Sequence, residues 1–221
     1  MRGLHAARAA LLMAVVLMGA HATAAELSGT PASLTAVQQP GYLAELAVAK
    51  MPSGLAGLCS RQPALCDPVA PAPGPLVLTP QRLALLGSVN HAINHHITST
   101  TDEQLYGRTE YWTLPSTAGD CEDYVLLKRQ TLAGLGIPLA SLLITVVHDE
   151  NGQGHAVLTI PTDRGDIVLD NRRDEILGWA ATGYKFVKRQ SAANANVWVS
   201  LASERLQATD IASAPEATPS H

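Results

Sequence analysis

Hydrophobic and polar residues recur with two different periods along the chain, and the change of period separates a helical part from a strand-rich part. Between Pro80 and His96 the apolar residues have helical spacing, with Thr79 as a candidate N-cap and proline at the first helical position. The core stripe of this predicted helix consists of Leu83, Leu86, Val89 and Ile93. A second predicted helix follows Cys121 and ends near Gly134, where a glycine C-cap precedes a proline.

Beyond the second helix the pattern is typical of β-strands. Residues 141–148 form a continuous apolar run suited to a central strand, and residues 155–160 and 166–170 predict the next two strands around a turn at 161–165. Shorter runs at 185–189 and 197–201 predict two more strands. Helices followed by an antiparallel sheet indicate an α+β domain, which we place at residues 77–201.

The remaining segments have other compositions. Residues 1–25 predict a signal peptide, with Arg2 and Arg8 before an apolar stretch too short to span a bilayer and a small-residue cleavage site; an uncleaved anchor is the alternative. Residues 26–76 form an N-terminal extension that ends in a proline-rich spacer. Residues 202–221 are polar and predict a disordered tail.

The net charge and the cysteine content narrow the classes of function that the chain could have. The net charge of the 221-residue chain is −4, so nothing indicates a nucleic-acid partner. Six residues separate Cys59 from Cys66, and this pair can close a small loop as a disulfide, which leaves Cys121 as an odd thiol. An unused thiol is a liability in an oxidising compartment, so a catalytic role is favoured. A different pairing and three reduced cysteines remain alternatives.

Cys121 lies at the start of the second predicted helix, among Asp120, Glu122 and Asp123. The amide dipoles of a helix N-terminus favour a thiolate, so this position is typical of a nucleophile. The alternative is that Asp120 or Glu122 caps the helix and that the thiol is incidental.

A base and its orienting partner can come from two neighbouring strands. If residues 161–164 form a four-residue hairpin loop, His155 and Asp170 are direct cross-strand partners, with Cβ atoms about 5 Å apart. The carboxylate would then hold the histidine in one tautomer. A five-residue loop would place Asn171 opposite His155 instead, giving Cys-His-Asn. A purely structural His-Asp pair is the third possibility.

The motifs together resemble a known family, the bacterial transglutaminase-like cysteine peptidases of the LapG type. The resemblance spans residues 80–190 and rests on Asn90-x-x-x-Asn94, Thr101-Asp102, Tyr106-Gly107, Tyr111-Trp112, Gly119-Asp-Cys-Glu-Asp-Tyr124, Gly154-His155-Ala156-Val157-Leu158 and Leu169-Asp170-Asn171. It implies a papain/transglutaminase-like core, with N-terminal helices packed on an antiparallel sheet, and a triad of Cys121, His155 and Asp170.

The resemblance also implies a biological setting. Members of the LapG type are periplasmic, bind calcium beside the catalytic cysteine, and cut the N-terminal region of large surface adhesins at an alanine pair, which releases cells from biofilm. An inner-membrane cyclic-di-GMP receptor sequesters them. We therefore expect an exported thiol protease; acyl transfer to an amine on the same triad, and an inactive binding module, are the alternatives.

The acidic residues around Cys121 give a local argument for calcium. Asp120, Glu122 and Asp123 would raise the pKa of the thiol, because like charges oppose its ionisation. A Ca²⁺ ion bound to these carboxylates would cancel that effect and hold the loop. Capping and solvation are the alternative roles of these acids.

His91 and His95 have the i,i+4 spacing that can hold a metal ion. No glutamate lies between them as in a zinc protease motif, so a polar helix face is the favoured interpretation.

Overall fold

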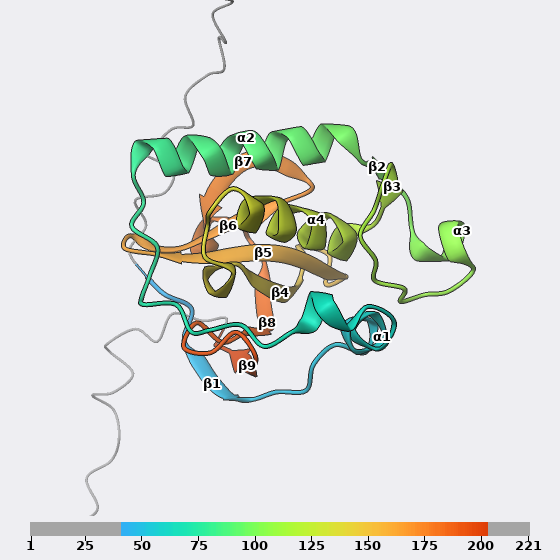
Figure 1. The fold of residues 1–221 in the computed structure, drawn as a ribbon, viewed down its shortest axis with the longest axis horizontal. Coiled ribbons are helices and arrows are strands. Elements are labelled where there is room, and N and C mark those ends of the chain that lie inside the picture. Colours follow the sequence, from blue (N-terminus) through green and yellow to red (C-terminus); the bar gives the residue numbers. More distant parts are fainter. Residues whose placement is uncertain (1–40, 203–221) are drawn as a thin grey trace, which may run out of the picture. The chain divides into compact units, whose positions relative to one another are not determined.

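The computed structural model describes residues 41–202 (Figure 1). The predicted signal peptide at 1–25 lies outside this range, as does the predicted disordered tail except for Ala202. Within the described range, no helix is long and apolar enough to cross a membrane.

The described residues form helices and strands in an α+β arrangement. The α-helices are α1 (Ser53–Arg61), α2 (Pro80–His96), α3 (Asp102–Tyr106) and α4 (Cys121–Gly134), with short 3₁₀ helices η2 (Pro63–Cys66), η3 (Leu139–Ser141) and η4 (Trp179–Ala181). The strands are β1 (Glu45–Val48), β2 (Thr98–Ser99), β3 (Ala118–Gly119), β4 (Leu143–His148), β5 (Gly154–Thr162), β6 (Gly165–Asp170), β7 (Arg173–Gly178), β8 (Lys185–Gln190) and β9 (Trp198–Leu201).

The main sheet has seven strands in the order β1-β9-β8-β4-β5-β6-β7, and each neighbouring pair is antiparallel. Strands β2 and β3 form a separate parallel pair just before α4. The predicted α+β class, with helices followed by an antiparallel sheet, is therefore confirmed.

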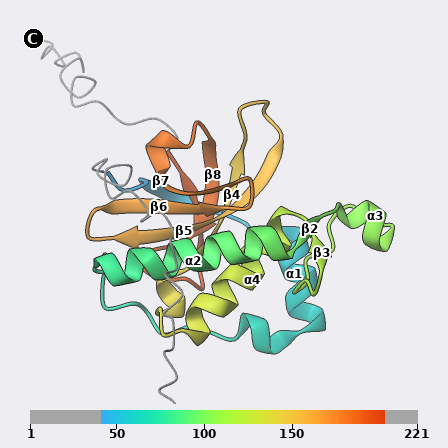
Figure 2. The same ribbon diagram turned by 90° about the horizontal axis from the view of Figure 1, so that it is seen from above.

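Helices α2 and α4 lie side by side on one face of the main sheet (Figures 1 and 2). Helix α2 has the predicted bounds, and the Thr79 hydroxyl accepts a hydrogen bond from the amide of Arg82, which caps the first turn. The predicted core stripe is confirmed, since all four of its members are buried. Helix α4 ends in a tight turn at Gly136, which has a φ of 90° that favours glycine.

The turn between β5 and β6 is tighter than predicted. Thr162 pairs directly with Gly165, and the register continues to Leu158 opposite Leu169, so the predicted four-residue loop is wrong. Pro161 suggested a turn but lies inside β5. Strand β5 runs on past its last β4 partner at Thr159, so no β4 residue requires an amide from the proline.

Two strands of the main sheet, β1 and β7, were not expected from the sequence, and neither was the short pair β2–β3. Strand β1 lies within the segment that we assigned to an N-terminal extension, and it pairs with β9 at the edge of the sheet. The buried guanidinium of Arg189 on β8 links β1 to the rest of the sheet, because it forms ion pairs with Glu45 of β1 and with Asp166 of β6. Strand β7 begins with the charged residues 173–175, which hide its alternation in the sequence.

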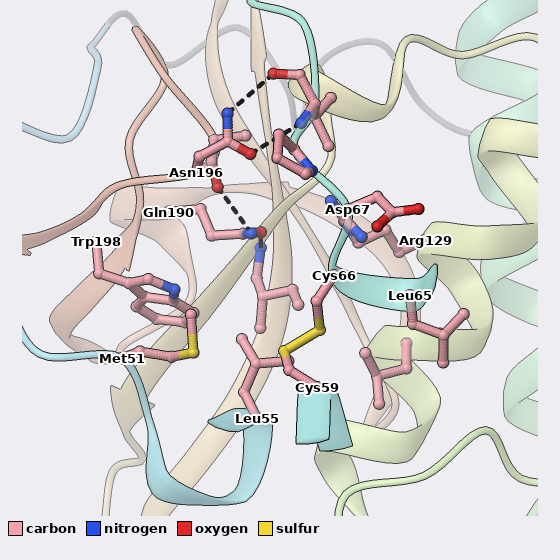
Figure 3. Close-up of a pocket in the computed structure, with 15 residues that line it drawn as sticks. Met51, Leu55, Cys59, Leu65, Cys66, Asp67, Arg129, Gln190, Asn196 and Trp198 are labelled. Carbon is pink, nitrogen blue, oxygen red and sulfur yellow. Dashed lines mark hydrogen bonds between the residues drawn. A yellow bond between two sulfur atoms is a disulfide. The ribbon is translucent and has the colours of Figure 1, made fainter. Parts of the chain in front are cut away.

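Cys59 and Cys66 form a disulfide between α1 and η2, as the sequence permitted, and Cys121 is a free thiol. The disulfide lines a cavity of about 150 Å³ that also reaches Arg129 of α4 and Trp198 of β9 (Figure 3). The residues around this cavity do not include Cys121, His155 or Asp170.

We predict that replacing both Cys59 and Cys66 with serine lowers the free energy of unfolding by about 2–3 kcal/mol, because a short loop loses its covalent closure. Denaturant unfolding of the variant and the parent measures this difference. Alkylation of the unreduced, unfolded parent should modify Cys121 alone; label on Cys59 or Cys66 would contradict the disulfide.

Candidate active site

His155 and Asp170 form a buried hydrogen-bonded pair on the main sheet. Nε2 of His155 lies 2.9 Å from Oδ1 of Asp170, and the two side chains are 1% and 2% exposed. The actual register differs from the predicted one by two residues, so the two residues are diagonal neighbours rather than direct partners. A shift of two keeps both side chains on the same face of the sheet, whereas a shift of one would have separated them.

Several donors hold the Asp170 carboxylate. The hydroxyl of Tyr184 donates to Oδ2 at 2.6 Å, and the amide of Arg172 donates to Oδ1 at 3.1 Å. Burial by itself raises the pKa of Asp170, but the hydrogen bonds from His155 and Tyr184 outweigh it and hold the pKa at about 2. The carboxylate is therefore ionised and accepts only, so Nε2 of His155 donates to it, and in the neutral form of the imidazole the lone pair is then on Nδ1.

Cys121 is the first residue of α4 and is half-buried. Strands β5 and β6 are paired only up to Leu158, so the start of β5, which carries His155, is not paired with β6. The backbone amide of Ala156, the residue after His155, lies close enough to Cys121 to lower the pKa of the thiol. The thiol therefore lies beside the segment of β5 that holds the candidate base.

The thiol is hydrogen-bonded to an acid rather than to the histidine. Sγ of Cys121 donates to Oε2 of Glu122 at 3.1 Å, and within residues 41–202 no hydrogen bond joins it to His155. Burial and the neighbouring Glu122 raise the pKa of Cys121 well above its usual value. Burial and Asp120 in turn raise the pKa of Glu122 to about 9. The site as it stands opposes thiolate formation.

Three carboxylates meet beside the start of α4: Asp102 of α3, Asp120 and Asp123. One oxygen of each lies within 4.8 Å of the others. One oxygen of each carboxylate accepts a hydrogen bond from a backbone amide. Asp102 accepts from the amide of Tyr111, Asp120 from the amide of Asp102, and Asp123 from the amide of Thr113. Burial is the main cause that raises the pKa of Asp123 to about 7 and that of Asp120 above its usual value.

The second oxygen of each of these three carboxylates is buried and has no hydrogen-bond partner. Buried carboxylate oxygens without a partner are costly, and a cluster of three such carboxylates is suited to a hard cation. Of the predicted metal ligands, Asp120 and Asp123 belong to this group. Glu122 lies next to it, since its carboxyl interacts with Asp120 while it accepts the thiol hydrogen.

The sequence did not indicate roles for two residues of the candidate site, Asp102 and Tyr184. Asp102 stood in the Thr101-Asp102 motif, but its place eighteen residues before Asp120 gave no sign that the two carboxylates meet. Tyr184 precedes β8 and carried no local signal at all. Both are brought to the site by packing between distant segments.

A half-buried thiol at a helix start, next to a strand with a hydrogen-bonded His-Asp pair, is the arrangement of the papain- and transglutaminase-like thiol enzymes. Residues 45–206 match the family of bacterial transglutaminase-like cysteine proteinases (BTLCP). The chain belongs to this family, because the match covers well over half of its length.

Two solved structures of one protein are similar to this chain. LapG of Legionella pneumophila is 30% identical over 48% of this chain and 62% of that chain, with a TM-score of 0.42. Its calcium-bound form is 28% identical over 55% of this chain and 70% of that chain, with a TM-score of 0.45. The chain thus spans less than two thirds of the first of these relatives. No curated protein matches it.

We predict that Tyr184→Phe raises the pKa of Asp170 by roughly one unit, because a hydrogen bond to a charged group is lost. The low pKa of Asp170 stabilises the fold above about pH 4, and this stabilisation is lost as the pH falls from about 4 to about 2. In the variant the stabilisation should be smaller and the loss should be complete at a higher pH.

Carbon-13 NMR titration of labelled aspartate measures this change, and Tyr106→Phe on α3 is the control. An unchanged Asp170 pKa in Tyr184→Phe would contradict the role of this hydroxyl.

Proposed function

We propose that this protein is an exported, calcium-dependent thiol protease in which Cys121 is the nucleophile, His155 the general base and Asp170 its orienting partner. The observation that carries the proposal is the buried His155–Asp170 pair, whose geometry leaves Nδ1 of the imidazole free as a proton acceptor. Membership of the cysteine proteinase family supports it.

The residues perform the reaction in two stages. Nδ1 of His155 accepts the proton of the Cys121 thiol, and the sulfur attacks the scissile carbonyl carbon to form a tetrahedral intermediate. His155 returns the proton to the leaving amine as the peptide C–N bond breaks, which leaves a thioester on Cys121. Water, deprotonated by His155, then attacks the thioester, and the free carboxylate product and the thiol are released. Asp170 stabilises the imidazolium that forms in each stage.

Calcium is assigned to the carboxylates of Asp102, Asp120 and Asp123, with Glu122 as a further candidate ligand. The support is their unpartnered buried oxygens, since Ca²⁺ binds six to eight oxygens and tolerates irregular geometry. When bound, the ion neutralises the acids around the thiol and so favours its ionisation.

The substrate that we propose is the N-terminal region of a large surface adhesin, cut at an alanine pair, and the proposed regulator is an inner-membrane cyclic-di-GMP receptor. The sequence resemblance supports both, and the signal-like pattern of residues 1–25 supports a periplasmic location.

We predict that Cys121→Ala, His155→Ala and Asp170→Ala each lower cleavage of a recombinant adhesin fragment by at least about a thousandfold, because the triad acts as a unit. Asn171→Ala, at the neighbouring position, is the control and should retain activity within about tenfold of the parent. Loss of activity in Asn171→Ala with activity retained in Asp170→Ala would replace the triad with Cys-His-Asn. Incorporation of a fluorescent amine, in place of a free carboxylate, would indicate acyl transfer.

We predict that a calcium chelator stops cleavage and lowers the melting temperature, and that Ca²⁺ restores both, because the ion binds the native state selectively. Asp102→Asn and Asp120→Asn should weaken Ca²⁺ binding by roughly tenfold or more, since ligand charge sets the affinity.

Glu103→Gln is the matched control, because this exposed acid follows Asp102 on α3 but lies outside the cluster. Titration calorimetry measures the affinity of each variant. Full activity in the chelator, together with no thermal shift on adding Ca²⁺, would remove the calcium site while leaving the triad proposal intact.

A further inference from the structure

A second group of metal-ligand side chains lies apart from the acids around Cys121. His91 and His95 of α2 face Asp174 of β7, and Nδ1 of His91 and Nε2 of His95 each lie 2.9 Å from the same oxygen, Oδ2 of Asp174. One potential ligand atom of each residue lies within 4.8 Å of the other two. The three side chains are 62%, 63% and 40% exposed, so an ion from solution can reach them.

We propose that His91, His95 and Asp174 form a binding site for a divalent transition-metal ion, with Zn²⁺ as its representative. Imidazole nitrogen and carboxylate oxygen are ligands that suit Zn²⁺, and three protein ligands leave one position for water. Ligand atoms around tetrahedral zinc are separated by roughly 3.3 Å when the bonds are 2.0–2.1 Å. The two nitrogens therefore need to move away from Asp174 by about half an ångström, which exposed side chains can do.

The supporting hydrogen bonds fit a metal-binding carboxylate. Nδ2 of Asn94 donates to Oδ1 of Asp174 at 3.0 Å, which orients the carboxylate and leaves Oδ2 for the ion. The same Nδ2 group donates to the backbone carbonyl of Asp170 at 2.9 Å. Because Asp174 lies in β7, a bound ion would cross-link α2 to the start of β7.

The role of this site is structural rather than hydrolytic. The residues between His91 and His95 are alanine, isoleucine and asparagine, so the glutamate base of a zinc protease motif is missing. The sequence alone favoured a polar helix face for the histidine pair. The third ligand, Asp174, comes from a strand about eighty residues later and changes that interpretation.

The test is calorimetric titration of Zn²⁺ into the full chain without an affinity tag. The Cys121→Ser background removes the free thiol as a competing soft ligand, and excess Ca²⁺ occupies the acids near α4. We expect one zinc ion per chain. His91→Ala and His95→Ala should bind it more weakly by roughly 10–100-fold or more, because each loses a direct ligand. Asp174→Asn, which keeps an acceptor for Asn94, should also bind more weakly.

His96→Ala is the matched control, because His96 is exposed on the same helix but is not part of the group. It should bind zinc like the parent. Zinc should also raise the melting temperature of the parent and of His96→Ala but not that of His95→Ala. Equal affinity in all four variants, or no binding to the parent at micromolar zinc, would overturn the proposal. Visible spectra of the Co²⁺ form, with intense tetrahedral bands lost in His95→Ala, give an independent readout.

Discussion

The arrangement of the candidate site depends on the hydrogen bonds that stabilise the buried negative charge of Asp170. An ionised carboxylate without partners would cost several kcal/mol in this environment, so donors from different parts of the chain surround it. His155 comes from β5, Tyr184 from the segment before β8, and the Arg172 amide from the following turn. Because these donors must all reach one carboxylate, the orientation of the imidazole is set by the fold as a whole.

The charges next to Cys121 present the opposite situation. Each of Asp102, Asp120 and Asp123 has one oxygen satisfied by a backbone amide and one buried oxygen without a partner. Asp170 has hydrogen-bond donors on both oxygens, whereas these acids lie against one another. Hydrogen bonds and the guanidinium of Arg173, 3.6 Å away, keep the Asp170 carboxylate ionised. Within residues 41–202 no ion pair reaches Asp102, Asp120 or Asp123, and a bound cation would neutralise these acids without protonating them.

Helix α2 connects these features to the core. Its apolar stripe packs on the sheet, while the side-chain amides of Asn90 and Asn94 donate to backbone carbonyls at the end of β6 and the start of β7. These amides satisfy one carbonyl group at the end of β6 and two at the start of β7, the last strand of the sheet. These hydrogen bonds explain why asparagines at helical spacing accompany the apolar residues that α2 packs on the sheet.

Much of the fold can be predicted from local patterns. The bounds of α2, the position of Cys121 at the start of α4 and the strands around His155 follow from periodicity, capping residues and glycine-proline signals, because these effects act within a few residues. The loop length between β5 and β6 does not follow, since Pro161 is compatible with a turn or with a strand end that lacks a partner. The predicted contact between His155 and Asp170 is still present because the register differs by two residues, which leaves both side chains on the same face of the sheet.

The sequence by itself determined the class of fold and the candidates for the proposed triad, with Asn171 left as the alternative to Asp170. The tertiary structure decided which residues surround them. Asp102, the first residue of α3, lies beside Asp120, and the Tyr184 hydroxyl before β8 donates to Asp170. Asp174 of β7 lies beside His91 of α2. Each of these contacts joins segments whose separation along the chain carries no periodic signal, so only the packing of helices on the sheet can bring them together.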